Sequence, residues 1–94
     1  MYGTVARMRL KPGVDPATIH LDSAPEELGE VLYRMDTEPD ICYLAVFFES
    51  KEAYFANAAS PEQAVRYQTF RAFLAEDPEW HDGEIVQSIF PPQN

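Results

Sequence analysis

The sequence predicts an α+β domain in which a four-stranded antiparallel sheet is covered by helices. Segments in which apolar and polar residues alternate lie near both ends of the chain and in a pair between them. After this pair the apolar period changes from two to about 3.6 residues, which is typical of helices. One segment of the pair is apolar on both of its faces. Because the chain has 94 residues, we expect one domain spanning residues 1–94.

The first predicted strand covers residues 2–10. Ala6, Met8 and Leu10 fall on one face, two arginines fall on the other, and "KPG" closes the segment with turn residues. Residues 14–28 are then expected to form one or two short helices. Pro16 suits the first turn of a helix and "SAPEEL" can cap a second one, although "TIHLD" between them has little pattern.

A β-hairpin is predicted over residues 30–49. "EVLYRMD" and "ICYLAVFFES" form its strands and "TEPD" supplies the turn. In "CYLAVFF" both alternating sets are apolar, which indicates a central strand covered on both sides. The helices of this short chain can cover one face only. We therefore expect a second copy of the sheet on the other face, and hence a homodimer.

Two helical stretches follow the hairpin. Ser50 can cap "KEAYFANAA", and "SPEQ" at residues 60–63 combines a capping serine, a proline at the first helical position and a glutamine in capping-box position. On the second stretch Tyr67, Phe70 and Leu74 fall within about 60° of one another and form an apolar stripe flanked by Arg66 and Arg71. This stripe is expected to pack on the sheet.

"EDP" ends the helix, because the residue before a proline is disfavoured in the α region, and "HDGEIVQSIF" is predicted as the last strand, residues 81–90. The expected order is strand, helix, strand, strand, helix, strand. This is the βαββαβ order of the ferredoxin-like fold, with a four-stranded antiparallel sheet and helices on one face.

Composition narrows the classes of partner. Seven Lys and Arg against sixteen Asp and Glu give a net charge of −9, which lacks the basic footprint needed for nucleic acid and disfavours anionic membrane surfaces. No apolar run reaches the roughly 20 residues needed to span a bilayer. Cys42 is the only cysteine and lies in an apolar run, so a buried thiol is expected. No export signal is visible at the N-terminus, and the cytoplasm is the expected location.

"DPEWHDGE" raises the question of a reactive site. His81 beside Asp82 or Glu84 has the residue types of a general acid or base. The same residues also fit a turn before Gly83, with Trp80 packing that corner against the core. Both interpretations, an acid–base site and a structural turn, stay open. Adjacent residues rarely point at one ion and no HxH or HxxxH spacing occurs, so no metal site is expected.

Three arginines on predicted strands, Arg7, Arg9 and Arg34, have two possible roles. They have the charge to bind an anionic ligand. Carboxylates such as Glu30 and Glu84 and the general acidity of the chain favour salt bridges instead.

The stretches "YGTVARMRLKPG", "YRMDTEPDICYLAVFFESKEAYFANAASPEQ" and "DPEWHDGE" resemble successive parts of the antibiotic biosynthesis monooxygenase-like domain. The resemblance covers nearly the whole chain. It implies a dimeric α+β barrel: a homodimer whose two sheets pack face to face, with a cavity between the sheet and the helices of each subunit.

Within that family the resemblance leaves two functions open, because fold does not determine activity. The first is a cofactor-independent monooxygenase that acts on a small aromatic or quinone-type compound. The second is a noncatalytic dimeric module that binds a small ligand or stabilises an assembly. If the chain is an enzyme, the candidate catalytic residues are His81 and Asn57, and the candidate substrate-binding residues are Tyr67, Phe70 and Trp80. Members that degrade haem use a histidine on the second helix, and residues 61–75 hold none, so no cofactor is expected.

Overall fold

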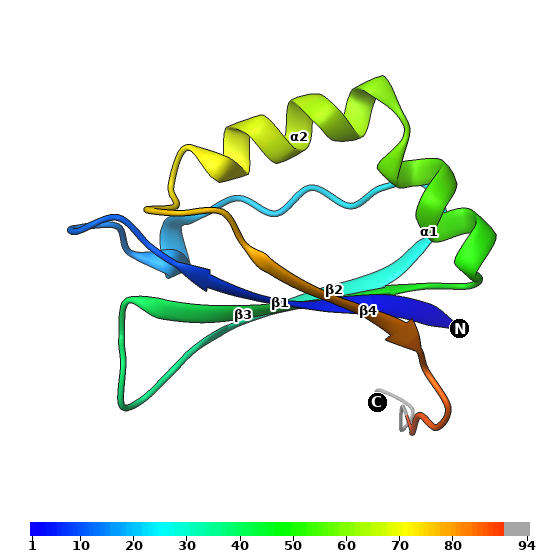
Figure 1. Ribbon diagram of the computed structural model, residues 1–94, viewed down its shortest axis with the longest axis horizontal. Coiled ribbons are helices and arrows are strands. Elements are labelled where there is room, and N and C mark those ends of the chain that lie inside the picture. Colours follow the sequence, from blue (N-terminus) through cyan, green and yellow to red (C-terminus); the bar gives the residue numbers. More distant parts are fainter. Residues whose placement is uncertain (90–94) are drawn as a thin grey trace, which may run out of the picture.

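The computed structural model describes residues 1–89 and has helices on one side of a four-stranded antiparallel sheet (Figure 1). The strands occur in the order β2-β3-β1-β4. This order and the two helices confirm the predicted ferredoxin-like α+β fold. The elements are β1 (Tyr2–Arg9), β2 (Glu27–Arg34), β3 (Ile41–Phe48), α1 (Lys51–Ala58), α2 (Pro61–Arg71) and β4 (Glu79–Glu84).

The two central strands, β1 and β3, supply most of the core. Their paired residues Ala6 and Leu44 face the helices, as do Met8 and Cys42, and all four are buried. The central position predicted for residues 42–48 is therefore confirmed, and so is the buried state of the Cys42 thiol.

The opposite face of the sheet is more open in this single chain. Val5, Val31 and Tyr33 have exposed fractions of 45%, 43% and 51%. The residues that pair with them in the adjacent strands lie on the same face of the sheet, because paired residues of neighbouring strands point to the same side. An apolar sheet face is thus left without helices.

The helix starts are those predicted. The side chain of Ser50 accepts a hydrogen bond from the amide of Ala53 at 3.0 Å, and Ser60 accepts one from the amide of Gln63 at 3.1 Å. The ring of Tyr54 on α1 packs against the sheet, with its centroid 5.6 Å from that of Phe48. In the part of the chain that the structure describes, neither helix is both long and apolar enough to cross a membrane.

The prediction of helices in residues 14–28 is wrong. Only a three-residue 3-10 helix, η1 (Pro16–Thr18), forms there, and Glu27 already belongs to β2. Asp15 caps this turn in an extended conformation, as expected before a proline, and Ile19 ends it in an extended conformation too. Pro25 would suit the first turn of a second helix, but Glu26 has a φ of 65° and Glu27 already pairs with Phe48 in β2, so no second helix forms. The chain instead runs extended on the helix side of the sheet (Figure 1).

The last strand is also displaced from its prediction. β4 spans Glu79–Glu84 rather than residues 81–90, and Phe90 lies outside the described residues. The reason is the length of its partner: Tyr2, the first residue of β1, pairs with Glu84. One further hydrogen bond, 2.9 Å from the amide of Ile85 to the carbonyl of Met1, ends the pairing.

Salt bridges account for two of the three strand arginines. Arg9 pairs with Asp40 and lies 3.5 Å from Glu76, and Arg34 lies 2.7 Å from Asp15. The last pair ties η1 to β2. The salt-bridge interpretation is therefore confirmed for Arg9 and Arg34, while Arg7 forms no ion pair within residues 1–89.

Candidate functional site

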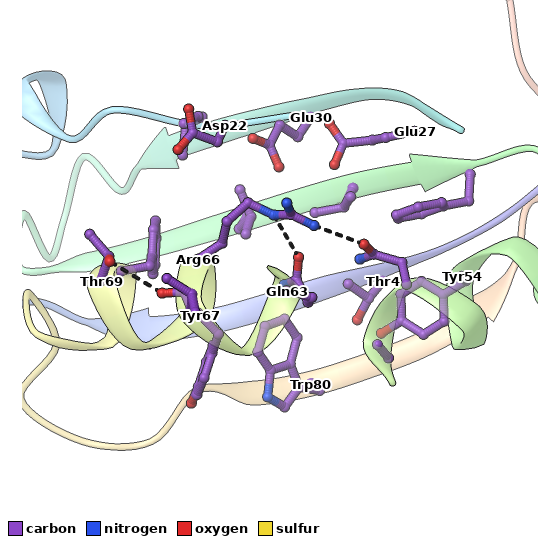
Figure 2. Close-up of a pocket in the computed structure, with 18 of the residues that line it drawn as sticks. Thr4, Asp22, Glu27, Glu30, Tyr54, Gln63, Arg66, Tyr67, Thr69 and Trp80 are labelled. Carbon is purple, nitrogen blue, oxygen red and sulfur yellow. Dashed lines mark hydrogen bonds between the residues drawn. The ribbon is translucent and has the colours of Figure 1, made fainter. Parts of the chain in front are cut away.

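A cavity of about 340 Å³ lies between the sheet and the helices (Figure 2). Its apolar floor is the helix-facing side of β3, with Leu44, Val46 and Phe48. The helices α1 and α2 form the opposite wall, and the extended segment His20–Asp22 closes one side. The sequence predicted helices in this segment, so this side of the cavity is formed by extended chain instead of a helix.

One side of the cavity is aromatic. The rings of Tyr67 on α2 and Trp80 on β4 have centroids 6.1 Å apart, and Phe70 lies on the same helix face. Trp80 pairs with Ala6, so it points to the helix side of the sheet, and it is 44% exposed. The structure brings all three predicted substrate-binding residues into this cavity, together with Asn57.

A β-bulge places two glutamates on the opposite side. Glu27 and Glu30 are three positions apart, and in a regular strand they would point to opposite faces. The register shifts between Glu27 and Gly29, so Glu27 pairs with Phe48 and Glu30 pairs with Val46. Both partners face the helices. The bulge therefore turns both carboxylates into the cavity.

The environment of Glu30 changes its acidity. Burial, and then the nearby charges of Glu27 and Asp22, raise its pKa from 4.5 to about 7, against the opposing effect of Arg66. Burial also raises the pKa of Glu27. A carboxyl group that titrates near neutral pH is suited to accept and return a proton.

Arg66 on α2 extends into the same space and is held by two amide side chains. Its Nε donates to Oε1 of Gln63 at 3.1 Å, and its Nη2 donates to Oδ1 of Asn57 at 3.0 Å (Figure 2). No carboxylate of the described residues lies within 4.0 Å of this guanidinium. A guanidinium has five N–H donors, so three remain for another acceptor. Asn57 thus orients Arg66.

The end of the cavity near α1 contains two hydroxyl groups. Tyr54 donates a hydrogen bond to Asp82 at 2.8 Å, and burial together with this bond raises its pKa to about 12. Thr4 is only 5% exposed. Its hydroxyl interacts with that of Tyr54 and opposes the rise of the Tyr54 pKa, but its Oγ1 makes no hydrogen bond of normal geometry among the described residues. An unsatisfied buried hydroxyl is uncommon in folded proteins.

His81 is not among the side chains that line the cavity. It pairs with Val5, so it points to the helix-free face of the sheet, and its Nε2 lies 2.9 Å from Oε1 of Glu79. His81 and Asp82 also do not form a turn, because both lie within β4 and pair with β1. The turn interpretation is therefore wrong, while a catalytic role for His81 stays a prediction.

Three cavity residues were not predicted as site residues from the sequence: Glu27, Glu30 and Arg66. Glu30 was expected to pair with strand arginines, and Arg66 was placed beside the aromatic stripe of its helix. The only signal in the sequence that could have indicated these residues was the position of Glu27 and Glu30 beside an apolar hairpin. In residues 1–89 no group of three or more His, Cys, Asp or Glu side chains could hold a metal ion.

Comparison with known proteins supports the fold. No family model and no curated protein matches the sequence. Among solved structures, a protein from Chloroflexus aurantiacus proposed to be an antibiotic biosynthesis monooxygenase is similar, with a TM-score of 0.76 and 24% sequence identity. The match covers 95% of this chain and 96% of that chain. The chain therefore has the ferredoxin-like α+β fold of that protein over nearly its whole length.

Proposed function

We propose that this chain is a cofactor-independent monooxygenase acting on a small phenolic or quinone-type compound in the cavity between sheet and helices. The observation that carries the proposal is the placement of Glu30 and Arg66 in one cavity with the rings of Tyr67 and Trp80. The likeness of fold to a protein proposed to be a monooxygenase gives independent support.

The cavity suits an aromatic compound of one or two rings. Ligand sites generally measure about 300–1,000 Å³, and this cavity of about 340 Å³ is at the small end of that range. The ring would lie against Trp80 and Phe70, which offer offset or edge-on aromatic contacts. Leu44 and Val46 complete an apolar surface beneath it.

In the proposed reaction the substrate supplies the electrons. Glu30 takes the proton of a phenolic hydroxyl, and the free N–H groups of Arg66 stabilise the phenolate oxygen. The phenolate transfers an electron to O₂, and the two radicals combine to form a C–O bond at the para carbon. Glu30 returns its proton to the resulting peroxide. Cleavage of the O–O bond with loss of the ring proton then gives a para-quinone and water.

The atoms balance without a cofactor. A phenol and one O₂ become a quinone and one water, and the water carries the second oxygen together with the phenolic and ring hydrogens. Molecular oxygen is the oxidant. We place the base at Glu30 rather than at His81, because His81 points to the other face of the sheet.

Oxygen consumption and quinone absorbance over a panel of 1-naphthols and meta-substituted phenols, whose para carbon carries hydrogen, test this function. Glu30→Gln is expected to lower kcat by about 10²-fold or more, because the amide cannot accept the proton. Two matched controls, Glu49→Gln on the exposed surface and His81→Gln on the opposite face, should retain full activity. Absence of turnover by the wild type over the whole panel would overturn the proposal. Ligand binding without turnover would support the noncatalytic module instead.

We also propose that the chain is a homodimer. The support is the apolar face of the sheet that the helices leave open. On this face Val5, Val31 and Tyr33 are all exposed in the single chain. Large exposed apolar surfaces are uncommon on monomers. A second copy of the same sheet would cover this face with a matching surface.

A further inference from the structure

Two polar atoms on the cavity wall make no hydrogen bond of normal geometry with the described residues. Oε2 of Glu27 and Oγ1 of Thr4 are buried and accept no hydrogen bond of normal geometry from any described residue. Thr4 as a whole is only 5% exposed. Buried polar groups left unpaired are destabilising, so both atoms are ready to bind a polar group that enters the cavity.

The charges around these atoms favour a cation. Asp22, Glu27 and Glu30 line the cavity, and Arg66 is the only lysine or arginine among the described lining residues. Asp22 lies 2.8 Å from Nε2 of His20, so Glu27 and Glu30 are the carboxylates there without an ion-pair partner among the described residues. Arg66 makes hydrogen bonds to Gln63 and Asn57 and forms no ion pair with a carboxylate among the described residues. A half-buried carboxylate without a cationic partner attracts positive charge more strongly than one in water does.

The charged and aromatic groups occupy different sides of the cavity. In Figure 2 Asp22, Glu27 and Glu30 lie along one side, Trp80 lies on the other, and Arg66 reaches between them. A molecule with a ring at one end and a positive group at the other would satisfy both sides. It would also leave Glu30 free to act on a hydroxyl of the ring.

We propose that the aromatic ligand of this cavity carries a protonated amine, which binds the Glu27 carboxylate while the ring lies against Trp80. This inference rests on the proposed function, because it names the substrate class of the same site. An ammonium group has three N–H donors and forms its strongest hydrogen bonds with carboxylates, so the free Oε2 of Glu27 is a suitable acceptor.

Three phenols that differ mainly in charge test the inference: tyramine, which is cationic, tyrosol, which is neutral, and para-hydroxyphenylacetate, which is anionic. Binding to the full chain can be followed through Trp80, because it is the only tryptophan and lines the cavity. Tyramine is expected to bind about tenfold more tightly than tyrosol, as one charge-assisted hydrogen bond allows, and the anion is expected to bind most weakly.

Glu27→Gln keeps the shape of the side chain and removes its charge. It should abolish the preference for tyramine over tyrosol and leave tyrosol binding nearly unchanged, while the exposed control Glu49→Gln should keep the preference. If Glu27→Gln does not fold, the three phenols with the wild type still decide. Equal binding of tyramine and tyrosol, tightest binding of the anion, or no binding of any of them would overturn the inference.

Oxygen consumption is measured separately with the meta isomers of these compounds, because the proposed reaction needs a hydrogen on the para carbon and the para-substituted phenols have none there. Charge-dependent binding without turnover would sink the proposed monooxygenase and leave the amine site standing. Turnover of neutral phenols as efficient as that of phenolic amines would support the proposed monooxygenase and overturn the amine site.

Discussion

The hydroxyl of Tyr54 donates a hydrogen bond to the carboxylate of Asp82 at 2.8 Å, and this bond joins α1 to the edge strand β4. β4 pairs with β1 on one side only. Because β4 also carries Trp80, the contact helps to hold one aromatic wall of the cavity in place.

We therefore expect Tyr54→Phe to lower the free energy of unfolding by about 1 kcal/mol, which is typical of one lost hydrogen bond. Urea denaturation measures the change. Tyr67→Phe, which removes a hydroxyl that makes no hydrogen bond with the described residues and lies away from the proposed dimer face, is the control and should have little effect. Equal losses in the two variants would show that the Asp82 contact contributes nothing.

Glu30 should make stability depend on pH. Its pKa is about 7 in the folded chain against 4.5 ordinarily, so the folded state holds this proton more tightly than the unfolded state. The resulting stabilisation is fully present below about pH 4.5 and is lost as the pH rises through 7.

Glu30→Gln stays neutral, and its stability relative to the wild type should rise between pH 5 and pH 8. Because Glu30 is only half-buried, solvent screening limits the gain to about 1 kcal/mol. Thermal denaturation at several pH values checks this, with Glu49→Gln as control. A constant difference between Glu30→Gln and the wild type would contradict the raised pKa.

Gly3 is predicted to be intolerant of any side chain. A Cβ atom built at this position would lie 2.1 Å from the carbonyl oxygen of Val46, which belongs to the backbone of β3 and cannot move aside cheaply. Gly3→Ala should destabilise the fold by about 2 kcal/mol or more. Gly83→Ala on β4 is the matched control, because a Cβ there meets nothing within 4 Å. Similar melting temperatures for the two variants would refute the close approach.

The proposed dimer predicts a mass of about twice 10.7 kDa by light scattering at micromolar concentration. Val31→Glu would place an unpaired charge in the interface and should give the monomer mass or an unfolded chain. Val65→Glu changes an exposed valine on α2, on the other side of the sheet, and should keep the dimer mass. A wild-type chain that runs as a stable monomer would rule out the homodimer.

The sequence was sufficient where local chemistry and burial agree. The run at residues 42–48 is apolar on both faces, and it became an interior strand. Ser50 and Ser60 cap helices because a serine hydroxyl followed by a helix former satisfies the free amides of the first turn. These signals act over a few residues, so they can be read without knowing the fold.

The sequence was insufficient where a distant strand decides. The end of β4 is set by the first residue of β1, about eighty positions earlier in the chain. The bulge at Glu27 and Gly29 depends on how β2 meets β3, and simple alternation would have put Glu27 and Glu30 on opposite faces. For this reason the sequence did not predict the acidic side of the cavity. The face on which His81 lies also depended on a distant pairing, that of β4 with β1.

The extended segment of residues 20–26 beside the cavity is held less firmly than the strands of the cavity floor. Among the described residues, no amide between His20 and Glu26 donates a backbone hydrogen bond, whereas the strands of the floor are paired throughout. Segments of this kind open without disrupting the rest of the fold. In a hydrogen–deuterium exchange experiment these amides should therefore exchange early and the β3 amides late. A ligand can then enter through the wall while the core stays closed, and slower exchange in residues 20–26 when it is present would show that the bound ligand holds this wall shut.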